Sequence, residues 1–169
     1  MGNYVNVAVV LKTKKDFDIA WQIAYDSDMA ESLFAQITGN YVVNFDIKYD
    51  MDWRIIRQIS KSVDEQVKVF THYDVDGTME MATYTAGKRD SKTRLNAYDV
   101  EYWLGLICVF GNIDWRLPLG EQKELVIKSP FKYSFLTRVY VVDYSNGTFE
   151  QIGGFKHMFE LPEVVKQYE

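Results

Sequence analysis

Hydrophobic and polar positions follow two periods along the chain, and this predicts both strands and helices. Residues 4–11, YVNVAVVL, alternate and then become continuously apolar, as a central strand does. Residues 41–50 carry alternate apolar side chains at 41, 43, 45, 47 and 49, with polar side chains at 44, 46, 48 and 50. This second pattern predicts a strand that is buried on one face only.

Helical spacing appears in four places before the C-terminal region. Thr13 with Asp16 three positions later resembles a capping box, and Phe17, Ala20, Trp21 and Ala24 follow at helical spacing. A second helical segment is predicted from Ala30 to Ile37, and a short helix from Asp52 carries Trp53, Ile56, Ile59 and Val63 on one side. The most apolar stretch, residues 96–112, predicts a buried helix, with a strand as the alternative.

Two hairpins are predicted from turn residues between extended runs. Asp76-Gly77 suits a two-residue turn, which would place His72 opposite Met81. Asn146-Gly147 suits a type I′ turn in the β-rich region that begins with the strand at 124–128, and Pro162 would start a final helix.

These elements predict an α+β fold with a mixed or largely antiparallel sheet, helices packed on one face, and loosely ferredoxin-like elements. The chain of 169 residues is 47% apolar and contains no linker-like stretch, so we expect a single globular domain over residues 1–169. The single cysteine, Cys108, cannot form an internal disulfide, and no apolar run approaches the roughly 20 residues of a membrane span. We therefore expect a soluble cytoplasmic protein. Low use of Ala and Pro suits an AT-rich genome, such as many phages have.

The sequence YDVDGT at residues 73–78 resembles the Asp-x-Asp-Gly-Thr motif of haloacid dehalogenase-like phosphatases. The resemblance implies that Asp74 is a nucleophile, Asp76 a general acid and base, and Mg²⁺ a cofactor. In that family the motif follows the first strand of a doubly wound α/β domain, and repeated strand-helix units come after it. Residues after Thr78 predict one long helix and several strands instead, so we favour the hairpin turn. No family resemblance extends over a larger part of the chain.

Charged and aromatic residues indicate where a partner would bind. The segment at 86–94 concentrates Lys88, Arg89, Lys92 and Arg94 in a chain of net charge −5, and it is predicted to be a solvated loop. Trp115 and Arg116 are predicted to lie in an exposed loop, and Trp and Arg dominate binding hot spots. His72 is expected to be half-buried and hydrogen-bonded.

No metal or other cofactor is predicted, because the two histidines, His72 and His157, lie far apart and Cys108 is expected to be buried. We favour a non-catalytic binding or inhibitor protein that engages another protein through an aromatic and charged surface. One alternative is a small hydrolase or phosphoesterase that uses Asp74 and Asp76. Another is a nucleic-acid-binding module that uses the basic segment at 88–94. The sequence leaves the partner's identity and the oligomeric state open.

Overall fold

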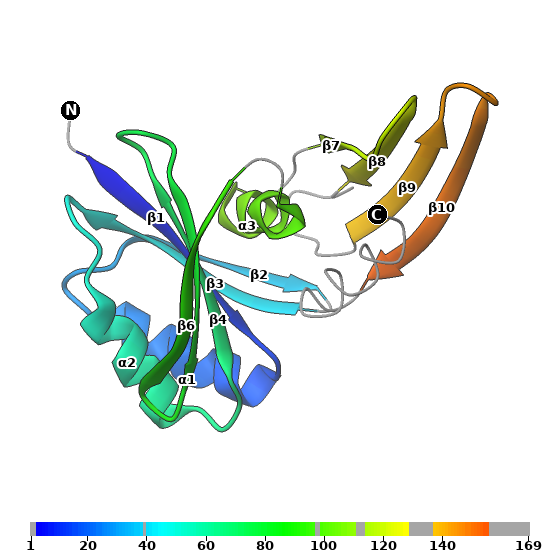
Figure 1. Ribbon diagram of the computed structural model, residues 1–169. Coiled ribbons are helices and arrows are strands. Elements are labelled where there is room, and N and C mark those ends of the chain that lie inside the picture. The colour runs from blue at the N-terminus through cyan, green and yellow to red at the C-terminus, as the bar shows by residue number, and fades with distance from the viewer. Residues whose placement is uncertain (1–2, 39, 97–98, 111–113, 129–136, 156–169) are drawn as a thin grey trace.

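The computed structural model describes residues 3–38, 40–96, 99–110, 114–128 and 137–155. Within these ranges two antiparallel sheets and three helices form an α+β fold (Figure 1). The α+β class is therefore confirmed. Every strand pairing in the described residues is antiparallel, and the loosely ferredoxin-like detail stays a prediction. One globular domain over residues 1–169 and a cytoplasmic location stay predictions.

The larger sheet has six strands in the spatial order β2-β3-β1-β4-β5-β6, and the smaller has four in the order β10-β9-β8-β7. The larger sheet contains β1 (Tyr4–Leu11), β2 (Glu31–Thr38), β3 (Asn40–Lys48), β4 (Val67–Tyr73), β5 (Met79–Thr85) and β6 (Lys88–Leu95). The smaller contains β7 (Asp114–Pro118), β8 (Lys123–Lys128), β9 (Thr137–Asp143) and β10 (Thr148–Phe155). The helices are α1 (Lys14–Asp26), α2 (Trp53–Ser62) and α3 (Val100–Phe110). No helix in the described part of the chain is long and apolar enough to cross a membrane.

Helices cover both faces of the larger sheet, so the prediction that they pack on one face is wrong (Figure 1). Both faces of β1 are apolar, so each needs a helix packed against it. Val5, Val7 and Val9 are buried beside α1 and α2, whereas Ala8 and Val10 are buried beside α3. α3 also packs against buried side chains of the smaller sheet. The prediction that β3 is buried on one face only is also wrong, because Val42 and Asn44 on its second face are buried beside α3, whereas Asp46 is half-buried and Lys48 exposed.

Two polar side chains on that second face bind the last turn of α3. Gln36 Nε2 and Asn44 Nδ2 both donate to the carbonyl oxygen of Cys108, at 2.8 and 2.7 Å. The last carbonyls of a helix lack partners within the helix, so these two buried amides satisfy one that would otherwise be unpaired.

The predicted cap at Thr13 is confirmed, and the helix predicted to begin at Asp52 is capped by that residue. Thr13 Oγ1 accepts from the backbone nitrogen of Asp16 at 3.1 Å, and Asp52 Oδ1 accepts from that of Arg54 at 3.0 Å. The buried Asp16 carboxylate accepts from the backbone nitrogens of Asp64 and Glu65 rather than from its own helix. It therefore joins α1 to the segment between α2 and β4.

The predicted helix over residues 30–37 is wrong, because this segment forms β2. A register shift between Glu31 and Phe34 and a positive φ of 54° at Ser32 break the alternation of a regular strand. A bulge adds one residue to a strand, so it moves later side chains to the opposite face and disturbs the period of two. The apolar spacing then imitates that of a helix.

Both predicted hairpins are confirmed, but their loops have four residues instead of two. Tyr73 N donates to Thr78 O at 2.9 Å, and His72 pairs with Met79, not with Met81. Asp143 pairs with Thr148, and in that loop φ is positive at Gly147 but not at Asn146, which excludes the type I′ turn. The predicted helix from Pro162, and His157, lie outside the described residues.

Candidate functional site

The four predicted basic residues at 88–94 lie in an edge strand, so the prediction of a loop is wrong. β6 pairs with β5 along one side only, and seven of its eight residues are exposed. The turn before it, Ala86-Gly87, has positive φ at both positions (50° and 80°), as a type I′ hairpin turn requires. A strand exposed on both faces needs no alternation, which is why its sequence looks like a loop.

Helix α2 contributes three further cations. Arg54, Arg57 and Lys61 recur at spacings of three and four residues opposite the buried side chains of the helix. With Gln58 they line a shallow cavity of about 290 Å³.

Packing between α2 and β6 places these cations on one continuous surface. Lys92 Nζ lies 5.1 Å from the centre of the Trp53 ring, and that ring stacks on Tyr84 with 6.0 Å between centroids. The Lys61 side chain packs directly over Gly87. The register pairs Tyr84 with Arg89, Ala82 with Lys92 and Glu80 with Arg94, so these three β6 cations share the face of the sheet that α2 covers.

We call this set the α2–β6 basic surface; it comprises Arg54, Arg57, Lys61, Arg89, Lys92 and Arg94. Lys88 pairs with Thr85 beside the turn, and the register places it on the opposite face of the sheet.

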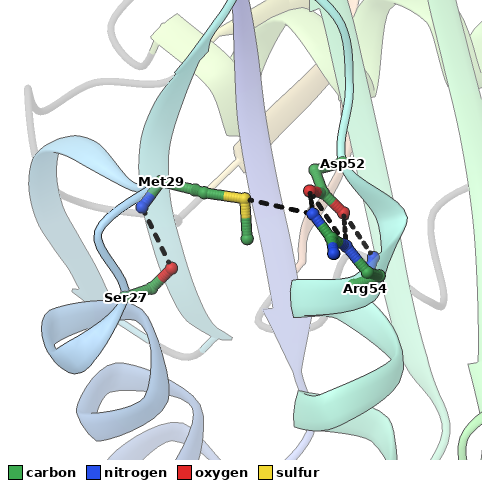
Figure 2. A network of polar contacts seen from close by, with 4 residues as sticks. All are labelled: Ser27, Met29, Asp52 and Arg54. Atoms are coloured by element: carbon green, nitrogen blue, oxygen red, sulfur yellow. Dashed lines mark hydrogen bonds and ion pairs between the residues drawn. The ribbon is translucent and has the colours of Figure 1, made fainter.

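Two of the six cations are paired with carboxylates. Arg54 binds Asp52 at 2.7 Å and also points its guanidinium at the sulfur of Met29, as Figure 2 shows. The hydrogen bond from the Arg54 side chain lowers the pKa of Asp52. Lys92 binds Glu80 at 3.3 Å. Six cations and these two carboxylates give a net charge of +4, so the rest of a chain of net charge −5 has a net charge of −9.

The other four cations of the surface have no carboxylate within ion-pair distance among the described residues. Arg94 makes a long hydrogen bond of 3.5 Å to Thr78 Oγ1. None of the large hydrophobic side chains that are exposed in the described part of the chain lies on α2 or β6. The exposed ones are Tyr25, Met29, Phe34, Tyr49, Val75, Phe110, Tyr144 and Phe149. The surface is therefore polar as well as cationic.

Trp115 and Arg116 lie in strand β7, so the prediction of an exposed loop is wrong. Trp115 pairs with Ile127 of β8, and its side chain lies outside the described part of the structure. Arg116 is exposed and approaches Glu124 at 3.6 Å. Because the smaller sheet lies on the α3 side of the larger one (Figure 1), Arg116 is not part of the α2–β6 basic surface.

His72 belongs to a row of polar residues on the α3 side of the larger sheet. Asn6 Nδ2 donates to Asp46 at 2.8 Å, and Asn6 Oδ1 lies 3.3 Å from His72 Nδ1. Since this amide oxygen only accepts, Nδ1 of His72 carries the proton. Burial lowers the pKa of His72, which favours the neutral imidazole, and burial raises the pKa of Asp46. The predicted half-buried, hydrogen-bonded histidine is confirmed.

Asp74 and Asp76 lie exposed in the β4–β5 loop. Asp76 accepts from Thr78 N at 2.9 Å, and the hydrogen bonds from Thr78 lower the pKa of the Asp76 carboxyl. This carboxylate therefore closes its own turn, and the sheet around it is antiparallel rather than doubly wound.

Asp52 lines a second cavity, which is acidic and has a volume of about 230 Å³. Four carboxylates line it: Asp28, Glu31, Asp50 and Asp52. In the part of the chain that the structure describes, no group of His, Cys, Asp and Glu side chains has the geometry to hold a metal ion.

No protein-family model, curated protein or solved structure matches this chain. Sequence reasoning found the cations of β6 but missed those of α2. The missed signal was the spacing of Arg54, Arg57 and Lys61 on the polar side of a predicted helix. No pattern in the sequence indicated that this helix and β6 are neighbours.

Proposed function

We propose that the protein is a non-catalytic binding or inhibitor protein whose α2–β6 basic surface engages an acidic surface of another protein. The observation that supports this function is the group of six cations on two adjacent elements, of which only two are paired with carboxylates. A cationic surface on a chain that is otherwise acidic attracts and orients an acidic partner over a distance of about 8 Å at physiological salt. Arginine, which supplies four of the six cations, is enriched in binding hot spots.

Three features favour a protein over a nucleic acid as the partner. Asp52 and Glu80 lie among the cations and would repel a continuous line of phosphates. Trp53 is stacked on Tyr84, and none of the large exposed apolar side chains lies on α2 or β6, so single-stranded bases find no exposed ring to stack on here. The net charge of −9 on the rest of the chain opposes any polyanion that extends beyond the surface.

Charge reversal of Arg57 tests the proposal. Arg57→Glu should weaken binding to immobilised poly-glutamate by about tenfold, which corresponds to roughly 1.4 kcal/mol, and more salt should reduce the difference. Arg57 is exposed, so the circular dichroism spectrum should not change. Arg138→Glu makes the same change of charge at an exposed position of the smaller sheet and is the matched control.

Two results would contradict the proposal. Equal weakening by Arg57→Glu and Arg138→Glu would show that only net charge matters. Tighter binding to duplex DNA or to oligothymidylate than to poly-glutamate, measured at the same salt concentration, would favour the nucleic-acid alternative.

A further inference from the structure

Strand β6 has one unpaired edge. It ends the six-stranded sheet, and no described strand lies on its outer side. Its residues from Lys88 to Arg94 are exposed. The backbone N–H and C=O groups along such an edge are available to another strand.

The register identifies which backbone groups point outward. Tyr73 and Thr78 are joined by a backbone hydrogen bond, so the alternation of an antiparallel ladder directs the backbone of Met81 and Thr83 toward β6. Their partners on β6 are Thr93 and Ser91. Lys92 lies between these two partners and Arg94 follows them. Both therefore direct their backbone N–H and C=O groups away from β5.

Side-chain directions coincide with this backbone pattern. Lys92 and Arg94 lie on the α2 face of the sheet, with the other cations of the α2–β6 basic surface. Ser91, Thr93 and Leu95 lie on the opposite face. A strand added at this edge therefore meets two alternate cations, Lys92 and Arg94, on one face and small or apolar side chains on the other. This alternation ends at the register shift beyond Ser91, where Asp90 follows Arg89.

We propose that β6 binds an extended segment of the partner protein as an additional strand, and that this segment carries acidic residues at two alternate positions, one residue apart. This inference rests on the function proposed above and specifies its partner and its binding mode. The two acidic side chains face Lys92 and Arg94, and the residues beside them, hydroxyl-bearing or small apolar, face Thr93 and Ser91. Main-chain hydrogen bonds hold the segment, and the alternation of charge selects it.

The net charge of β6 disfavours a second copy of this chain as the added strand. Each β6 strand carries four cations and one carboxylate, Asp90, so two copies side by side would each bring a net charge of +3, and like charges destabilise a strand pair. Charged edge residues in general prevent uncharged strands from pairing. An acidic segment turns the same cations into attractive cross-strand partners.

The test uses the whole protein and four capped heptapeptides, with binding followed by isothermal titration. The first peptide, Glu-Thr-Glu-Val-Glu-Thr-Glu, has the proposed alternation. The second has the same composition with the four Glu residues grouped at one end. The third and fourth repeat the first, with N-methyl groups on all Glu residues or on all Thr and Val residues. Each set of methyl groups removes the N–H donors of one edge of the peptide strand.

We expect the alternating peptide to bind at least about tenfold more tightly than the grouped one. One N-methylated peptide should lose this binding and the other should retain it, because only one edge of the added strand faces β6. In the complex the amide protons of Lys92 and Arg94 should exchange more slowly with solvent, whereas that of Thr93, already bonded to β5, should not change.

A pair of substitutions gives an independent readout. Lys92→Pro and Lys92→Ala both remove the cation, but only proline removes the outward N–H, and proline is tolerated on edge strands where the N–H faces solvent. The alternating peptide should bind Lys92→Ala several times more tightly than Lys92→Pro.

Equal binding of all four peptides would overturn strand addition and leave the proposed function intact. Binding of none of them would overturn both. Binding of oligothymidylate in their place would also overturn both, in favour of the nucleic-acid alternative.

Discussion

Gly105 brings α3 into close contact with Phe70 and Met79 of the larger sheet, and replacing it by alanine tests the packing of this interface. A Cβ atom at position 105 would lie 2.7 Å from Cδ1 of Phe70 and 3.0 Å from the sulfur of Met79. Non-bonded carbon atoms attract best at about 3.5–4.0 Å, so the methyl group needs a displacement of nearly 1 Å. Phe70 and Met79 are both fully buried, so neither side chain has open space to enter.

Two effects of opposite sign determine the outcome for Gly105→Ala. Alanine favours the helix by about 1 kcal/mol relative to glycine. Forcing an extra methyl group into a close-packed core typically costs about 1–3 kcal/mol. Because the two crowded side chains cannot move into solvent, we expect crowding to exceed helix propensity. The free energy of unfolding should decrease by about 1–2 kcal/mol.

Urea unfolding of the wild-type protein and the Gly105→Ala variant measures this change, with an unchanged m-value as the sign that only stability is affected. Phe70→Leu provides the matched control, since the smaller side chain gives the methyl group room. In the double variant the two effects should compensate, with a favourable coupling of about 1 kcal/mol. A neutral or stabilising Gly105→Ala substitution, or strict additivity with Phe70→Leu, would refute the reasoning.

Three further predictions concern buried polar and titratable groups. Asn44→Ala should lower the free energy of unfolding in urea by about 1–2 kcal/mol, because Gln36 still donates to the Cys108 carbonyl, and a change below about 0.5 kcal/mol would contradict this role. Burial lowers the pKa of His72 from 6.5, so the unfolded chain binds the proton more tightly; stability should be full above about pH 6.5 and decrease as pH falls through that value. The measurement is made in an Asp46→Asn background, because the raised pKa of Asp46 changes the free energy of unfolding with pH in the opposite direction. In that background His72→Gln should reduce the dependence of the free energy of unfolding on pH near 6.5. An unchanged dependence would show that His72 does not cause it. Burial raises the pKa of the Cys108 thiol, so Ellman's reagent should react with it only at the rate of unfolding, and rapid labelling of the native protein would contradict its burial.

Local sequence was sufficient for several elements of the fold. The continuous apolar run of β1, the caps at Thr13 and Asp52 and the two hairpins follow from hydrophobic period and turn chemistry. The buried helix α3 follows from an apolar run too long for a typical strand. Each of these signals acts within about ten residues, which is the range over which period and capping operate.

β2, β6 and the loop lengths could not be predicted from these signals. The bulge in β2 disguises its period, and the exposure of β6 on both faces removes any period. The packing of α3 on the second face of the sheet could not be predicted either. It places the Cys108 carbonyl against Gln36 and Asn44, which are 64 residues or more away in the sequence.

The candidate site shows the same division. The charges of Lys92 and Arg94, and the helical spacing of Arg57 and Lys61, are properties of the sequence alone. Their meeting on one surface depends on the order of strands in the sheet, which places β6 at its edge and beside α2. Strand order is set by which long-range pairings bury the most apolar surface on both faces, and no local pattern encodes that choice.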